Sequence, residues 1–504
     1  METLRKKSVL ERQKSHFYTI EKLLIPKSYD MELQLPKLRK VDPNKPKKKK
    51  ILLLSDDLRL HSGIATQSKE MVLSTLHKYD WVQLGAALKH PDEGKIFDLS
   101  ADASKEMGID DGYLKVYAST GYGTPDVLRN LLNIEKPDAI LHFTDPRFWG
   151  WLYNMEHEVR QFVPIMYYNI WDSLPDPMWN APFYASCDLL MSISKQTYGI
   201  NKRVLEKYGM AKEDWAYKYI PHGVSRHFKP IDDNDTKLVQ FKEKFGLTQY
   251  DFVVLWNNRN IRRKVPGDVI LAFNEFAKRH QDKKVCLFIH TQPVDDNGTD
   301  IPEVIKWNGE YGDYKFTNSH FSTEDLNFFY NSGDIILNIA SNEGFGLASC
   351  EALRAGTPII VNVTGGLQDQ CGFELDGKEL TAEDYVKIGS LHNRREWASL
   401  QSSGRLACGA WAFPSWPSNL SLQGSPATPY IFDDRVDYFE VANQLESAFG
   451  LGREKLTEYG QLGHEWIVSD AGMSMESMGG RFIEAIDGCF QNWTSRKRFE
   501  IYSV

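Results

Sequence analysis

Residues 337–366 form the stretch that most constrains how this chain can fold. An apolar run that begins at Leu337 ends in a turn at Gly344, a helical segment follows as far as Gly356, and Pro358 precedes a second, β-branched run. This order of strand, tight turn, helix and strand predicts one βαβ unit.

Two carboxylates stand eight positions apart in this unit, Glu343 at the turn and Glu351 within the helix. The helix N-terminus beside them offers free backbone N–H groups and the positive end of a dipole, which suit a diphosphate. Glu351 lies about two turns further along, where a carboxylate accepts hydrogen bonds from ribose hydroxyls. The unit therefore predicts a site for a nucleotide with a group attached to it.

Short apolar runs alternate with helical segments along most of the 504 residues, which exceed the size of one ordinary core. One series begins at residues 50–57 and a second at residues 252–256, so we expect two doubly wound α/β domains with a cleft between them. Residues 371–435 are rich in Pro, Gly, Ser and Trp, which predicts an ordered insertion or a long loop rather than helix or strand. The predicted divisions are an appendage over 1–48, domains over 49–230 and 240–475, and a helical segment over 476–504 that returns to the first domain.

The N-terminal segment is basic, although the whole chain has a net charge of −8. Residues 1–50 contain 15 Lys or Arg and six Asp or Glu, and residues 45–50 form the densest cluster. A basic arm favours an anionic partner such as a nucleic acid or a membrane surface, while a solvated tether is the alternative.

The chain contains no apolar run of the roughly 20 residues that a membrane span needs. Residues 1–7 do not resemble a secretory signal, and the six cysteines show no CxxC pairing, which favours free thiols in a reducing compartment. We therefore expect a cytoplasmic protein without a transmembrane segment.

Further motifs accompany the glutamate pair, and together they resemble the GT-B glycosyltransferases, most closely the large retaining family 4. The resemblance covers roughly residues 50–370 and the C-terminal helices, and its specific signal is the EX7E motif, Glu343 and Glu351 with Gly-Phe-Gly-Leu between them. The other matching pieces are Ser62-Gly63-Ile64, Ser194-Lys195, Ile220-Pro-His-Gly-Val224, Arg259, Arg263-Lys264 and Gly365-Gly366.

The resemblance implies two Rossmann-like domains that face a central cleft, with the acceptor on the first and a nucleotide sugar on the second. It implies a retaining, metal-independent hexosyl- or pentosyltransferase that uses a UDP- or GDP-sugar as co-substrate and needs no cofactor. Such a mechanism asks the protein mainly for positioning and electrostatics.

Roles for single residues follow from the same resemblance. Arg259 and Lys264 would hold the diphosphate, Glu351 the ribose, and Glu343 the transferred sugar. Gly63 would let the first-domain loop approach the donor. The backbone that would face the sugar and phosphates belongs to Gly344, Phe345, Gly346 and Leu347.

One departure concerns the acceptor side, where many relatives have a histidine after a first-domain strand. The corresponding run here, residues 165–172, has no histidine, so either Asn169 or Asp172 takes its place or the position differs from that of the relatives. His142, at the end of the preceding strand, is a second candidate for a catalytic residue. A structural role is the alternative for a single histidine at a strand end.

The acceptor is the open question. The basic arm favours DNA, as in the phage-type glycosyltransferases that act on hydroxymethylated bases, or a membrane-associated glycan or lipid. Aromatic residues near 148–151, Trp171 and Trp179 predict either stacking on an acceptor or core packing. Two other classes remain: a catalytically inactive GT-B-like module that binds nucleic acid, and a nicotinamide-dependent oxidoreductase, against which the single glycine of residues 58–65 argues.

Overall fold

The computed structural model describes residues 47–317, 320–389 and 391–497. The predicted basic appendage, residues 1–48, therefore falls almost wholly outside the described residues. Its last member, Lys48, donates to the Asp111 carboxylate at 2.9 Å. The two lysines that follow form ion pairs within the first domain, Lys49 with Asp138 and Lys50 with Glu135.

The first domain contains a sheet of eight strands among the described residues. Its central strand holds the fully buried run Ile51–Leu54, and such a continuous apolar run is typical of a parallel strand covered on both faces. In spatial order the strands are β3 (Ile96–Asp98), β4 (Leu114–Thr120), β2 (Tyr79–Ala87), β1 (Lys49–Asp56), β5 (Ala139–Phe143), β6 (Ile165–Asn169), β7 (Leu189–Ser192) and β8 (Tyr217–Tyr219). β3 alone is antiparallel to its neighbour in this described sheet.

Helices connect these strands, and side chains cap several of them. The Ser62 hydroxyl accepts a hydrogen bond from the Ala65 amide at 3.0 Å, which begins the first helix directly after the loop that follows β1. The helices are α2 (Gly63–Thr75), α3 (Ser100–Met107), α4 (Pro125–Glu135), α5 (Gly150–Asn154), α6 (Glu156–Val159), α7 (Ala181–Ala185) and α8 (Lys195–Lys207).

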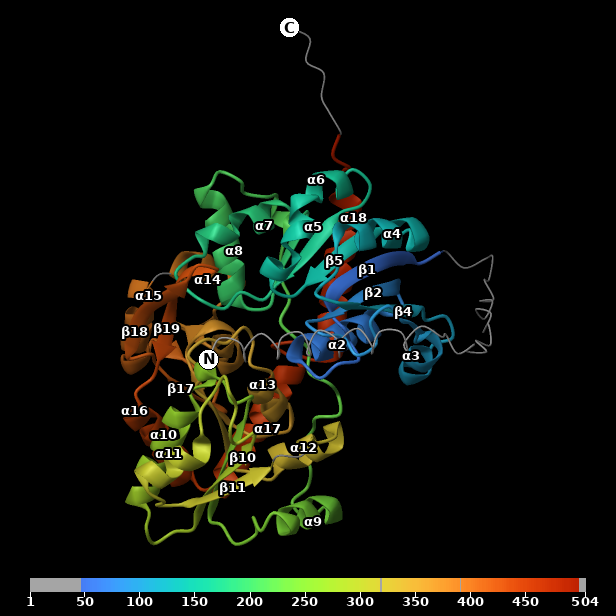
Figure 1. Cartoon of the computed structure of the whole chain (residues 1–504). Coiled ribbons are helices and arrows are strands. Elements are labelled where there is room, and N and C mark those ends of the chain that lie inside the picture. Colours follow the sequence, from blue (N-terminus) through green and yellow to red (C-terminus); the bar gives the residue numbers. More distant parts are fainter. Residues whose placement is uncertain (1–46, 318–319, 390, 498–504) are drawn as a thin grey trace, which may run out of the picture. The chain divides into compact units, whose positions relative to one another are not determined.

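The second domain contains a parallel sheet of six strands within the described part of the chain (Figure 1). In spatial order they are β11 (Asp313–Thr317), β10 (Val285–His290), β9 (Phe252–Asn257), β12 (Ile335–Asn338), β13 (Ile359–Asn362) and β17 (Ala412–Ser415). This is the 3-2-1-4-5-6 order of the Rossmann fold, and the first sheet follows the same order apart from its edges. The predicted fold class, two Rossmann-like α/β domains, is confirmed.

Helices cover the second sheet and continue to the end of the described chain. They are α9 (Thr236–Lys244), α10 (Pro266–Arg279), α11 (Ile301–Asn308), α12 (Thr323–Asn331), α13 (Leu347–Arg354), α14 (Ala382–Ile388), α15 (Leu391–Ser402), α16 (Tyr438–Leu451), α17 (Arg453–Val468) and α18 (Met475–Asn492). Two short 3₁₀ segments adjoin the carboxyl edge of the sheet, η4 (Arg262–Lys264) and η5 (Gly365–Cys371).

The prediction that residues 371–435 form neither helix nor strand is wrong. This segment contains α14, α15 and the edge strand β17, together with β14 (Glu374–Leu375), β15 (Lys378–Glu379), β16 (Leu406–Ala407), β18 (Asn419–Ser425) and β19 (Thr428–Arg435). Pro414 lies within β17, and proline is tolerated there because an edge strand pairs on one side only. β18 and β19 form a separate two-stranded antiparallel hairpin.

The C-terminal helix α18 packs on the first domain, beside α2, although α17 belongs to the second (Figure 1). Tyr79 of β2 donates a hydrogen bond from its hydroxyl to the Asp487 carboxylate of α18 at 2.7 Å. The chain therefore passes between the domains twice, once before α9 and once between α17 and α18.

Candidate active site

The carboxyl ends of β9 and β12 mark the point where the strand order of the second sheet reverses. Connections leave these two neighbouring strands toward opposite sides, so a crevice forms beyond their ends. Asn257 ends β9, Asn258 and Arg259 follow it, and the turn with Glu343 follows β12. A cavity of about 540 Å³ lies there, within the size range of small-molecule sites.

Glu343 is almost fully buried in this cavity, between two cations of η4. Its carboxylate pairs with the Lys264 ammonium, and Arg263 Nη1 donates to the same oxygen at 3.1 Å. Burial alone would raise the pKa of Glu343, but the charges of Lys264 and Arg263 lower it to about 2. Glu343 is therefore a permanent anion at physiological pH and cannot act there as a general acid.

Glycines bring the backbone of this turn close to the segment that follows β13. Gly346 has φ +91°, a left-handed conformation, at the residue that precedes α13. A Cβ atom on Gly365, where φ is +50°, would lie 1.9 Å from the Glu343 carbonyl oxygen. The turn and the start of α13, where helix N–H groups have no partner within the helix, line the cavity at Gly346, Leu347 and Ala348.

Glu351 lies one turn into α13, at the end of a hydrogen-bonded chain. Asn257 donates to the Tyr330 hydroxyl at 2.7 Å, and that hydroxyl donates to Glu351 Oε2 at 2.6 Å. Burial raises the pKa of Glu351 to about 7, against the effect of the Tyr330 hydrogen bond. One carboxylate oxygen is thus held by the protein, and the chain orients the group toward the cavity that it lines.

The first domain supplies the opposite wall of the cavity. Gly63 lies close to the start of α13, because a Cβ atom on Gly63 would be 3.4 Å from Leu347 Cδ1. Asp172 follows β6, and burial raises the pKa of its carboxyl while the charge of Arg263 lowers it. The cavity brings together ten of the site residues predicted from the sequence, and His142 and the alternative Asn169 are not among them: Gly63, Asp172, Arg259, Lys264, Glu343, Gly344, Phe345, Gly346, Leu347 and Glu351.

His142 does not line this cavity. Its ring is fully buried within the first domain, stacked on Tyr167, with Nδ1 2.7 Å from the Tyr153 hydroxyl. Burial lowers the pKa of His142 to about 3, so the ring is neutral. These contacts are those of a core histidine, and Asn169, the other alternative, is also buried, with its amide donating to Asn201.

The histidine that does line the cavity is His222, to which the sequence assigned no role. It lies between Phe345, with ring centroids 5.1 Å apart, and Tyr168, whose hydroxyl is 2.8 Å from Nδ1. Burial lowers the pKa of His222 to about 3. The matching motif Ile220–Val224 includes His222, and this is the sequence signal that could have identified it. Arg263 also belongs to a matching motif, but its pairing with Glu343 joins distant segments and could not be predicted from the sequence.

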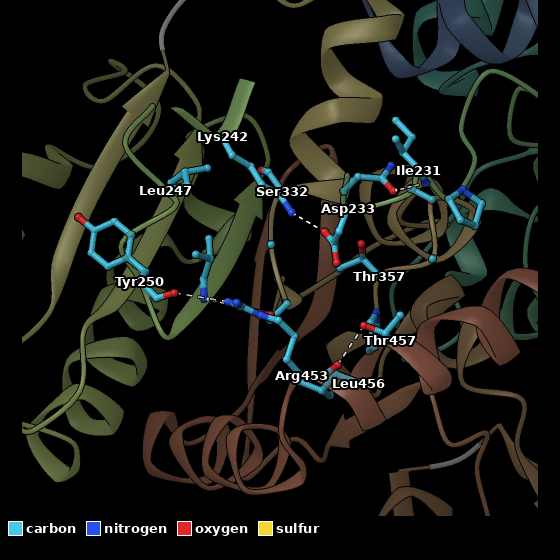
Figure 2. Close-up of a pocket in the computed structure, with 18 of the residues that line it drawn as sticks. Ile231, Asp233, Lys242, Leu247, Tyr250, Ser332, Thr357, Arg453, Leu456 and Thr457 are labelled. Carbon is cyan, nitrogen blue, oxygen red and sulfur yellow. Dashed lines mark hydrogen bonds and ion pairs between the residues drawn. The ribbon is translucent and has the colours of Figure 1, made fainter. Parts of the chain in front are cut away.

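A second cavity, of about 370 Å³, lies at the opposite, amino ends of the strands of the second sheet (Figure 2). Its four charged side chains are already paired with one another. Arg453 donates to Asp334 at 2.6 Å, and Lys242 donates to Asp233 at 2.6 Å. The first cavity, with its cations beside a glycine-rich turn, is the better candidate for a charged ligand.

Known proteins resemble this chain in sequence and in fold, although no protein-family model matches it. The alpha-monoglucosyldiacylglycerol synthase of Acholeplasma laidlawii is 27% identical over 163 residues, 32% of this chain and 39% of that relative. The D-inositol 3-phosphate glycosyltransferase of Corynebacterium jeikeium is 26% identical over 222 residues, 42% and 49% of the two chains. The chain thus spans less than half the length of these curated relatives.

Among solved structures, sucrose-phosphate synthase from Thermosynechococcus elongatus superposes with a TM-score of 0.60 at 13% identity, over 88% of this chain and 100% of that chain. The fold of this chain is the GT-B fold. Its sequence relatives are glycosyltransferases, so the predicted resemblance to GT-B glycosyltransferases is confirmed.

No helix within the described residues is long and apolar enough to cross a membrane. The same residues contain no cluster of three or more His, Cys, Asp or Glu side chains arranged to hold a metal ion. The cytoplasmic location and the independence of metal stay predictions.

Proposed function

We propose that this protein is a glycosyltransferase that moves a sugar from a nucleotide diphosphate to an acceptor hydroxyl. The observation that supports this most directly is the joining of Glu343, Lys264 and Glu351 in one cavity at the switch point of a GT-B domain. The completeness of this set favours an enzyme over an inactive binding module.

The nucleotide would lie along the second domain. Its ribose hydroxyls reach Glu351, and its diphosphate reaches Arg259, Lys264 and the N–H groups at the start of α13. Lys264 and Arg263 pair with Glu343, so a diphosphate that binds these two cations would compete with Glu343 for them. The donors that we expect are UDP- or GDP-sugars.

The transferred sugar would lie between Glu343 and the first domain. As the bond from the anomeric carbon to the diphosphate oxygen breaks, positive charge develops on the sugar ring, and the Glu343 carboxylate stabilises it. The acceptor oxygen forms its bond on the same face, and its proton passes to the leaving phosphate oxygen. The product then retains the anomeric configuration. Asp172, which lines the same cavity, would orient the acceptor hydroxyl.

A donor panel tests this function. The purified protein is incubated with UDP-, GDP- and ADP-sugars, both hexosyl and pentosyl, with and without acceptors, and nucleotide release is measured. Without an acceptor, we expect slow hydrolysis of one of the donors. With a suitable acceptor, we expect faster release of the nucleotide from that donor. Binding of no nucleotide sugar, together with no release, would overturn the proposal.

The finer assignments need separate measurements. Proton NMR coupling at the new anomeric centre tests retention, since inversion would contradict the same-face path. Activity that survives exhaustive chelation with EDTA is expected for a metal-independent enzyme, and recovery only on addition of Mg²⁺ or Mn²⁺ would contradict that prediction.

A further inference from the structure

A third cavity, of about 580 Å³, adjoins the proposed donor site. Asp172 and Arg263 line both cavities, and Asn342, the neighbour of Glu343, lines the third one as well. A molecule in this cavity would therefore contact Arg263, which pairs with Glu343, and Asn342, which precedes Glu343 in the chain.

The walls of this cavity come from both domains and from the β18–β19 hairpin. The first domain contributes Arg147 and Trp171, and the segment from η4 into α10 contributes Arg262, Arg263 and residues 265–268. The hairpin contributes Gln423, Thr428, Ile431, Asp433 and Arg435. Residues 371–435, which the sequence predicted to form neither helix nor strand, thus supply one wall of this cavity.

Hydrogen bonds hold the hairpin on both domains. The Phe432 amide donates to the Leu174 carbonyl of the first domain at 2.6 Å. The Asn342 side chain donates to the Phe432 carbonyl at 2.9 Å, on the second domain. Arg147 donates to the carbonyl of Ala427 at 3.2 Å and to the Thr428 hydroxyl, at the hairpin turn. The wall therefore has a defined position relative to Glu343.

Several polar side chains in this cavity are available to a ligand. Those of Arg262, Gln423 and Asp433 make no hydrogen bond or ion pair with other described residues. The half-buried Trp171 ring, whose Nε1 donates to the Ser173 carbonyl at 2.6 Å, lies among them. A carboxylate, an amide and a guanidinium can each bind two neighbouring hydroxyls, and an aromatic face packs on a sugar ring.

We propose that the β18–β19 hairpin forms the acceptor subsite, and that the acceptor is a polyhydroxylated ring, a sugar or a cyclic polyol. This inference rests on the proposed glycosyltransferase activity. Asp433 and Gln423 bind hydroxyls of the ring, and another hydroxyl points toward Asp172 and Glu343. The hairpin then determines which acceptors the enzyme accepts.

The test measures transfer with the donor selected by the panel above and with glucose, fructose, myo-inositol and their monophosphates as acceptors. The variants are Asp433→Asn and Gln423→Ala. Leu422→Ala is the matched control, because this neighbouring hairpin side chain is 62% exposed and does not line the cavity.

We expect transfer to at least one of these acceptors. Each cavity variant should raise the acceptor KM about tenfold, because a hydrogen bond to a charged or polar group is lost. Hydrolysis of the donor without acceptor should stay within about twofold, and Leu422→Ala should change neither value. Unchanged hydrolysis also shows that a variant is folded.

Two outcomes would overturn the inference and leave the proposed function standing: transfer in which both variants keep the wild-type KM, and donor hydrolysis with no transfer to any hydroxylated ring. Failure of the proposed function looks different, since the wild-type protein would then release no nucleotide from any donor, and both proposals would fall.

Discussion

At the scale of single residues, the two glutamates of the motif have opposite protonation behaviour. The cations of η4 hold the pKa of Glu343 at about 2, whereas burial raises that of Glu351 to about 7. The first carboxylate is therefore a constant charge, and the second is a titrating group at neutral pH. This difference predicts separate effects on turnover and on nucleotide binding.

Replacement of the constant charge should lower turnover without weakening nucleotide binding. We expect Glu343→Gln to lower kcat by about 100- to 1,000-fold, because one preorganised charge at the reacting centre is lost. The Kd for the nucleotide should be unchanged or lower, since Lys264 and Arg263 lose their competing partner. Stopped-time assays measure kcat, and calorimetry measures the Kd for the nucleotide. Parallel losses in kcat and in affinity would contradict this role.

The titrating carboxylate should make donor binding depend on pH. Only the ionised form of Glu351 accepts two ribose hydroxyl hydrogen bonds, and its fraction rises as pH increases through about 7. Affinity for a nucleotide sugar should therefore be about tenfold higher at pH 8 than at pH 6. Calorimetry at both pH values tests this, with Glu351→Gln expected to bind weakly and to lose this part of the dependence.

Glu70 of α2 titrates in the same range, because burial raises its pKa to about 7, and its charge raises the pKa of Glu351. In Glu70→Gln, the midpoint of the plot of nucleotide-sugar affinity against pH should therefore shift to lower pH. The affinity should still depend on pH, because Glu351 still titrates. If the pH dependence of affinity disappears in Glu70→Gln and persists in Glu351→Gln, the titrating group is Glu70 of the first domain, which contradicts the prediction.

At the scale of elements, the turn between β12 and α13 depends on close backbone packing. Gly365→Ala places a Cβ atom 1.9 Å from the Glu343 carbonyl oxygen, whereas Gly377, with φ +77°, has no atom within 4 Å. Both substitutions strain a left-handed residue by about 1–2 kcal/mol. Gly365→Ala should lower the free energy of unfolding by more than about 3 kcal/mol and also lower kcat.

Denaturant titration of both variants separates backbone strain from the clash. Equal losses for Gly365→Ala and Gly377→Ala would show that the turn tolerates displacement of Glu343.

The sequence predicted the elements that are buried and local. β9, Phe252–Asn257, begins at the predicted residue because a central parallel strand is a continuous apolar run. β17 was missed because an edge strand can contain Pro414 and needs no such run. β4, Leu114–Thr120, alternates buried and half-buried residues, a period-two signal that its Lys and Tyr residues obscure.

The contrast between local patterns, which the sequence shows, and distant contacts, which it does not show, also applies to the candidate site. Glu343 and Glu351 are close in sequence on one βαβ unit, so their spacing was informative. The choice between His142 and His222 was not available from the sequence, because both follow or end a strand. Only the packing shows that the first ring faces Tyr153 and Tyr167 in the core, while the second borders the cavity.

At the scale of the whole described chain, the first domain is completed by a helix from the carboxyl-terminal end of the sequence. α18 buries Met478, Phe482 and Ile486 against the first domain. Phe482→Ala should lower the free energy of unfolding by about 3–5 kcal/mol, because it leaves a cavity in a tightly packed core. Glu484→Ala is the control on the same helix, since its side chain is 76% exposed.

Denaturant unfolding and limited proteolysis measure the effect of Phe482→Ala. Cleavage should appear first in the first domain, within α2 or β2, if α18 is part of its core. Loss of stability confined to α16 and α17 would contradict that assignment.

The position of α18 has a consequence for how the protein is made. A ribosome that has released residues 49–219 has supplied every strand of the first sheet, yet the helix that covers α2 is synthesised more than 250 residues later. Until then the side of α2 that includes Ser74, which lies against Gly479 of α18, lacks its partner and is open to chaperones or to other nascent chains. Folding of the amino-terminal half must therefore wait for the carboxyl-terminal end, and a translation arrest anywhere in the second domain would leave both halves incomplete.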